Sequence, residues 1–89
     1  MLTQTIAINN RVGLHSKPAA LFVQCANRFA SEIYVNKGAT RVNAKSIMGV
    51  MILSVDQGDT VTLEVSGDDE AVAMTTLVDL IQRNFGIKE

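Results

Sequence analysis

Four short stretches of alternating apolar and polar residues, separated by helical patterns, most constrain what this chain of 89 residues can fold into. Such alternation is typical of strands that bury one face and expose the other. A chain of this length forms one compact unit, so we expect a single domain over residues 1–89. The expected strands are 2–8, Glu32–Lys37, Thr40–Asn43 and Thr60–Ser66.

Two helical patterns lie between these strands. In the segment 16–27, apolar residues recur at the spacing of one helix face. Pro18 fits only the first turn of such a helix, where its missing N–H is tolerated. A shorter helix is expected over 45–53, with Ser46 as its N-cap, because serine is among the best capping residues.

The acidic stretch 67–70 precedes a third helical pattern, which extends to about residue 84. We interpret Asp68, Asp69 and Glu70 as capping charges of this helix. The first and third helices are expected to cover the buried face of the sheet. We therefore predict an α+β fold, a two-layer open-faced sandwich with three helices.

Composition excludes several classes of site. The chain has one cysteine, Cys25, so it forms no intramolecular disulfide, and with a single histidine we expect no metal site and no cofactor. We interpret Cys25 as a packing residue. A net charge of −1 argues against direct binding of nucleic acid. No apolar run approaches bilayer length and no leader is evident, so we expect no membrane insertion and a cytoplasmic location.

His15 directly precedes the first expected helix, and this position determines the predicted chemistry. The free N–H groups of a first helical turn, together with the positive end of the helix dipole, form an anion site. The same dipole favours a neutral, nucleophilic imidazole. We predict that His15 accepts and gives away a phosphoryl group, with the N–H groups near Ser16 and Lys17 around its oxygens. Lys17 is expected to be an electrostatic partner of the phosphate. The alternatives are that Lys17 is only a solvated surface lysine and that His15 is a surface histidine without a role.

The second expected helix is short and buries only one stripe, so some of its apolar residues are left over. Ile47, Met48 and Met51 are predicted to form an exposed patch that docks partner proteins, because methionine adapts to several partners. Ala20 and Gln24 of the first helix are expected to border this patch. The alternative is that these apolar residues all belong to the core.

Two motifs resemble one protein family, the HPr histidine-containing phosphocarrier proteins of the bacterial sugar phosphotransferase system. The first combines Gly13-Leu14-His15 with Pro18-Ala19-Ala20, and the second is the segment from Val42 to Met51. They lie at the family's spacing, and the order of elements also agrees. The resemblance implies a four-stranded antiparallel sheet with strand order 1-4-2-3.

The resemblance also implies a function. His15 would receive phosphate from phosphorylated enzyme I, whose donor is phosphoenolpyruvate, and pass it to the A domain of a sugar-specific enzyme II. The chain would act as a carrier and not as an enzyme. Independently of the resemblance, a monomer is the default expectation. Residues equivalent to the expected patch contact these partners in the family.

Ser46 matches a regulatory position of the Gram-positive branch of the family. There a serine kinase/phosphorylase modifies the serine, and the phosphorylated form acts with a catabolite-control transcription factor. One alternative is therefore a regulatory-only paralogue that uses Ser46 and not His15. Another is a small-ligand regulatory domain of similar shape, which only the topology supports.

Three residues beside the histidine depart from the family pattern. The family commonly has Thr, Ser or Asn where this chain has Val12, usually Ala where Ser16 stands, and almost always Arg where Lys17 stands. Valine donates no side-chain hydrogen bond to a phosphate, and lysine lacks the planar fork of arginine. We expect the Ser16 hydroxyl to compensate in part.

Overall fold

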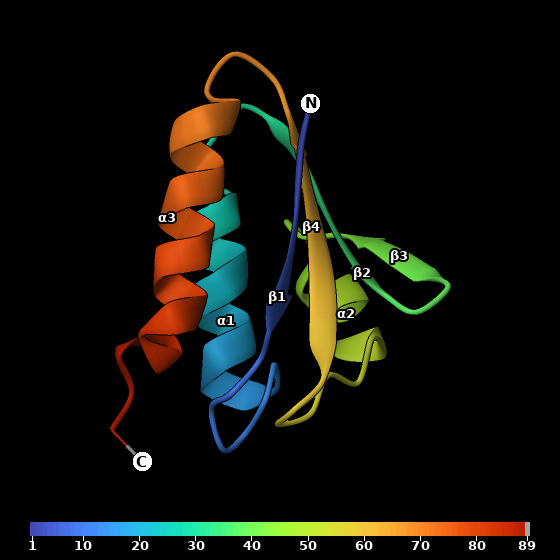
Figure 1. The fold of residues 1–89 in the computed structure, drawn as a ribbon, viewed down its shortest axis with the longest axis vertical. Coiled ribbons are helices and arrows are strands. Elements are labelled where there is room, and N and C mark those ends of the chain that lie inside the picture. Colours follow the sequence, from blue (N-terminus) through green and yellow to red (C-terminus); the bar gives the residue numbers. More distant parts are fainter. Residues whose placement is uncertain (89) are drawn as a thin grey trace.

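The computed structural model describes residues 1–88, and Figure 1 shows how its helices and strands are arranged. The elements follow the predicted order, with one additional short 3₁₀ turn near the end. They are β1 (Leu2–Ala7), α1 (Ser16–Ala26), β2 (Glu32–Lys37), β3 (Thr40–Asn43), α2 (Ile47–Ile52), β4 (Thr60–Ser66), α3 (Glu70–Gln82) and η1 (Asn84–Gly86).

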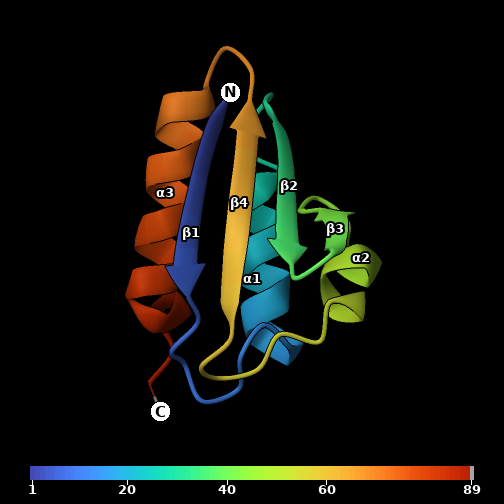
Figure 2. The same ribbon diagram turned by 45° about the vertical axis from the view of Figure 1, so that its right-hand side comes forward.

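The four strands form one antiparallel sheet in the order β1-β4-β2-β3, as predicted (Figure 2). In the registered pairs, Ile6 lies opposite Val61 and Val35 lies opposite Leu63, so apolar residues of neighbouring strands share one face. β1 and β3 form the two edges of the sheet.

Helices α1 and α3 lie side by side over one face of the sheet, and the other face is left open, as Figures 1 and 2 show. α2 lies beside α1 and β3, next to the β3 edge. The alternating apolar residues of β2 and β4 point into the layer between sheet and helices. The largest fully buried apolar side chains there are Phe22, Ile8, Leu14, Ile33, Leu63, Leu77, Val35, Val50, Val55, Val61 and Val65. No helix within residues 1–88 combines the length and apolar character needed to cross a bilayer.

Most element bounds agree with the prediction, and the main difference is at the end of α3. This helix ends at Gln82, and the chain then makes the η1 turn instead of continuing to residue 84. Asn84 and Phe85 have φ angles of 53° and 60°, outside the helical region. The change of direction brings the Phe85 ring into the core, where it is 3% exposed. Burial of an aromatic ring offsets the cost of this backbone conformation.

The N-cap of α3 falls within the predicted acidic stretch, but the side chain at this position bonds elsewhere. Asp69 occupies the N-cap position but makes no side-chain hydrogen bond to the helix. Its carboxylate instead accepts hydrogen bonds from the Ala30 N–H at 2.8 Å, the Ser31 N–H at 2.9 Å and the Ser31 hydroxyl. These bonds, led by that from the Ser31 hydroxyl, lower the pKa of Asp69. The carboxylate therefore ties the start of α3 to the turn before β2.

The neighbouring carboxylate of Glu70 behaves as expected. It accepts a hydrogen bond from the Gly67 N–H at 3.2 Å, three residues earlier. This satisfies a backbone donor in the turn that precedes the helix.

Two loops meet at the end of the sheet where α1 begins. One connects β1 to α1, and the other connects α2 to β4. The Leu14 N–H donates to the Val55 carbonyl at 2.9 Å, and the Gly58 N–H donates to the Ile8 carbonyl at 2.7 Å. Gly13 has a φ of 73°, and a Cβ atom there would lie 2.3 Å from the Val55 carbonyl oxygen. Only glycine allows the loops to approach this closely.

We predict that Gly13→Ala destabilises the protein by at least about 2 kcal/mol, because both the positive φ and the contact with Val55 oppose a Cβ atom. Gly38→Ala is the matched control. Gly38 also has a positive φ, 59°, but nothing lies within 4 Å of the position that a Cβ atom would occupy. Its substitution is expected to cost only about 1 kcal/mol. Urea unfolding of both variants measures the difference, and equal losses would contradict the steric argument.

We predict a pH-dependent effect for Asp69→Asn. A lowered pKa means that the charged carboxylate favours folding above the ordinary aspartate pKa of about 3.9, and that this contribution is lost as the pH falls through the lowered value. The variant is therefore expected to be less stable than the wild type at pH 7, and the gap is expected to narrow below about pH 4. Urea midpoints between pH 7 and pH 2.5 test this. Asp68→Asn, at an exposed neighbouring position, is the control. A stability difference between Asp69→Asn and the wild type that does not change with pH would refute the role given to the charge.

Candidate functional site

His15 lies where the β1–α1 loop enters α1. It is the N-cap residue, with extended backbone angles (φ −123°, ψ 167°), and its side chain makes no capping hydrogen bond. The imidazole is 34% exposed. The preceding Leu14 is buried and is held to Val55, so the backbone at His15 is fixed while its ring reaches solvent.

The first turn of α1 leaves backbone donors beside this ring. Pro18 has no N–H, and the first helical hydrogen bond runs from the Ala19 N–H to the His15 carbonyl at 3.3 Å. The N–H groups of Ser16 and Lys17 precede this bond, at the positive end of the helix dipole. Ser16 has a φ of 50°, a left-handed conformation that costs about 1–3 kcal/mol. The donors that the sequence predicted near His15 therefore lie on a strained turn.

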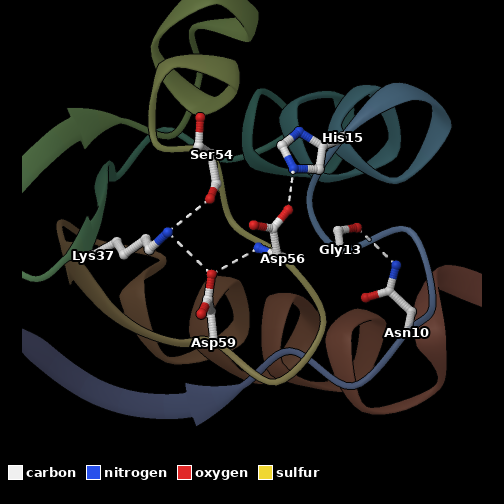
Figure 3. A network of polar contacts seen from close by, with 7 residues as sticks. All are labelled: Asn10, Gly13, His15, Lys37, Ser54, Asp56 and Asp59. Carbon is white, nitrogen blue, oxygen red and sulfur yellow. Dashed lines mark hydrogen bonds and ion pairs between the residues drawn. The ribbon is translucent and has the colours of Figure 1, made fainter.

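The nearest side-chain partner of His15 was not found by sequence reasoning. Nε2 of His15 lies 3.0 Å from Oδ1 of Asp56, a residue of the α2–β4 loop (Figure 3). A carboxylate accepts hydrogen bonds, so the ring carries a proton on Nε2 in this contact. The other ring nitrogen, Nδ1, is turned away from Asp56 in Figure 3. The expected neutral ring is compatible with this arrangement if its single proton is on Nε2.

The α2–β4 loop that carries Asp56 is itself held by a charged network (Figure 3). Lys37 Nζ donates to the Ser54 carbonyl at 2.7 Å and pairs with Asp59 Oδ2 at 3.0 Å. The same Asp59 oxygen accepts the Asp56 N–H at 2.8 Å. This backbone bond, with the Lys37 ammonium, lowers the pKa of Asp59. Lys37 is the last residue of β2, so the network connects the end of this strand to the backbone at Asp56 and holds that backbone in place.

The other residues predicted around His15 lie at the surface. Ser16 and Lys17 are exposed, and neither side chain makes a hydrogen bond or ion pair within residues 1–88. Val12 is 45% exposed in the same loop. The role of Lys17 as a phosphate partner stays a prediction, because its side chain forms no hydrogen bond or ion pair with another residue of 1–88 that would indicate its role.

Ser46 caps α2, as predicted. Its hydroxyl oxygen accepts a hydrogen bond from the Gly49 N–H at 3.1 Å, and the residue is exposed. Gly49 lies close to Ser46 and Val42, since a Cβ atom there would be 3.3–3.4 Å from their side chains. The glycine therefore has a packing role that offsets its low helix propensity.

The predicted apolar patch is exposed. Ile47, Met48 and Met51 are 41%, 72% and 51% exposed, while Val50 of the same helix is fully buried. The structure adds Ile52, which is 68% exposed and which sequence reasoning missed. The four exposed residues Ile47, Met48, Met51 and Ile52 are called the α2 patch below.

The two residues expected to border this patch differ in burial. Gln24 is exposed on α1, and Ala20 is half-buried. α1 and α2 contact each other, so both residues lie on the helix that is adjacent to the α2 patch.

A pocket of about 240 Å³ lies elsewhere, between the second half of α1 and the end of α3. Cys25 lines it and is buried, as expected for a packing residue, and burial raises the pKa of its thiol. Within residues 1–88, no three His, Cys, Asp or Glu side chains are placed to hold a metal ion. The pocket is also lined by Leu21, Gln24, Arg28, Thr76, Leu80 and Arg83.

Comparison with known proteins identifies the family. The family model described as "PTS HPr component phosphorylation site" matches residues 2–83. The phosphocarrier protein HPr of Neisseria meningitidis serogroup B is 49% identical over 86 residues, which cover 97% of each chain. The HPr-like protein Crh of Halalkalibacterium halodurans is 47% identical, over 93% of this chain and 99% of the relative.

Solved structures agree with the sequence relatives. HPr-C-His from Thermoanaerobacter tengcongensis superimposes with a TM-score of 0.97, covers 100% of both chains and is 54% identical. HPr from Bacillus anthracis has a TM-score of 0.88 at 40% identity, over 91% of this chain and 96% of that one. Sequence, fold and motif spacing together place the chain in the HPr family of phosphocarrier proteins of the sugar phosphotransferase system.

Proposed function

We propose that His15 accepts a phosphoryl group from phosphorylated enzyme I and passes it to the A domain of a sugar-specific enzyme II. The observation that carries this proposal is a solvent-reachable imidazole at the start of α1, with Nδ1 turned away from its only side-chain partner within residues 1–88. The chain acts as a carrier in the cytoplasm and has no turnover of its own.

The chemistry follows from the tautomer. With the proton on Nε2, the lone pair of a neutral ring is on Nδ1, and this nitrogen attacks the phosphorus atom. The transferred group carries its charge on oxygens, which the N–H groups of Ser16 and Lys17 and the helix dipole stabilise. The Ser16 hydroxyl and the Lys17 ammonium add donors from the same turn. Lysine supplies charge there without the two-pronged grip of arginine.

The α2 patch is proposed as the docking surface for enzyme I and for the A domains of enzyme II. An exposed apolar surface with two methionines adapts to partners of different shape. Gln24 and Ala20 on the adjacent helix complete this surface. Dimers are described for HPr of T. tengcongensis and for Crh of Bacillus subtilis; the carrier cycle proposed here needs only the monomer.

Ser46 is proposed as a second, regulatory phosphorylation site, modified by a serine kinase/phosphorylase and read by a catabolite-control transcription factor. Its hydroxyl is exposed at the start of α2, directly before the α2 patch. A phosphate there is tolerated by the helix dipole, so its effect is on docking and not on folding.

The alternative is a regulatory-only role through Ser46. The similarity to the Crh proteins of H. halodurans, at 47% identity, and of B. subtilis, at 46% identity, supports this alternative. His15 and the donors around it are retained in this chain, which supports the carrier role instead.

We predict that incubation with enzyme I and ³²P-phosphoenolpyruvate labels the protein, that the label is lost in acid, and that His15→Ala takes up none. Phosphohistidine is labile in acid and phosphoserine is stable, so acid treatment before gel analysis identifies the residue type. Labelling only by ATP and a serine kinase, with an acid-stable product, would refute the carrier role and support the regulatory one.

We predict that Ser46→Asp weakens binding to enzyme I by about three- to tenfold, because a negative charge beside the α2 patch disfavours an acidic partner. Ser46→Asn is the matched control, since Asn and Asp are both good N-caps and only Asp adds charge. Titration calorimetry at low and high salt measures the effect, and salt is expected to reduce it. Equal affinities of the two variants at low salt would exclude charge repulsion.

A further inference from the structure

We propose that Asp56 is a positioning residue for the phosphoryl acceptor: its carboxylate holds the ring proton on Nε2 and stabilises the positive charge that the ring gains on phosphorylation. This inference rests on the carrier function proposed above. Asp56 lies outside both sequence motifs, and the proposal gives it a role.

The contact between the two side chains is direct. Nε2 of His15 and Oδ1 of Asp56 are 3.0 Å apart, an ordinary distance for an N–H···O hydrogen bond. Because the carboxylate accepts only, it selects the tautomer with the proton on Nε2. It also restrains rotation of the ring, so that Nδ1 faces away from Asp56 (Figure 3).

The backbone of Asp56 is held from two directions, which distinguishes it from a mobile surface acid. On one side, the preceding residue Val55 accepts the Leu14 N–H through its carbonyl at 2.9 Å. On the other side, the Asp56 N–H donates to Asp59, which is paired with Lys37. The acid and the histidine are thus joined both through backbone and through side chains.

The carboxylate suits the charge change of the transfer step. Nδ1 forms a bond to phosphorus, the bond from phosphorus to the donor breaks, and its electron pair leaves with the donor. The proton on Nε2 stays in place, so the ring becomes a phosphorylated cation. An adjacent carboxylate stabilises this cation more than it stabilises the neutral ring. The protonated ring is also the better leaving group in the next transfer.

Exposure limits the size of the effect. The side chain of Asp56 is 74% exposed and that of His15 is 34% exposed. Solvent screens pairs of this kind, so removal of the carboxylate is expected to change rates by about two- to fivefold and not to abolish transfer.

The test uses three full-length variants. Asp56→Asn retains an acceptor but removes the charge, and Asp56→Ala removes both. Asp68→Asn is the control, because it removes the same charge from an exposed position just before α3. Figure 1 shows that the start of α3 and the start of α1 lie at opposite ends of the molecule. Imidazole ¹⁵N NMR reports the tautomer, rapid-quench labelling by phosphorylated enzyme I reports acceptance, and ³¹P NMR follows spontaneous hydrolysis of the product.

Both Asp56 variants are expected to accept phosphate about two- to fivefold more slowly and to hydrolyse more slowly near neutral pH, with affinity for enzyme I unchanged. Only Asp56→Ala is expected to lose the bias of the neutral ring toward the Nε2 proton. A merely structural role would not slow hydrolysis. Rates and tautomers equal to those of Asp68→Asn, or faster acceptance by Asp56→Asn, would overturn the proposal. Absence of labelling in the wild type would instead refute the carrier function itself.

Discussion

The hydrogen bond from the Leu14 N–H to the Val55 carbonyl joins two loops that are distant in the sequence, and the geometry of the site depends on it. It fixes the chain immediately before His15 and immediately before Asp56. Gly13 makes the bond possible because any side chain there would overlap the Val55 oxygen. Main-chain packing thus sets where the side chains of His15 and Asp56 begin, and the contact between the two side chains then orients the imidazole.

Much of the fold could be predicted because its signals are local or periodic. Alternation in β4 and the spacing of apolar residues in α1 reflect burial on one face, and both elements are observed close to their predicted bounds. The Ser46 cap was predictable for the same reason, since a cap depends on residues three positions apart. The position of His15 before Pro18 likewise indicated a helix start.

The parts that were missed depend on side chains that meet only in the folded chain. Asp69 is of a residue type that is common at N-caps, but its side chain bonds to Ala30 and Ser31, which are distant in the sequence and follow no pattern that includes it. Asp56 is of a residue type that is common in turns, and it reaches His15 only because the two loops are packed together. Sequence patterns give the backbone frame and the reacting group, whereas polar pairing across loops requires coordinates.

The burial of Cys25 has a practical consequence. The residue is 7% exposed, and burial raises the pKa of its thiol, so we expect it to react slowly with maleimides at neutral pH. A second cysteine introduced on the open face of the sheet would therefore take up a fluorophore or spin probe selectively. Site-directed spectroscopy of complexes of this protein could therefore use the native chain as its starting point, without replacing Cys25.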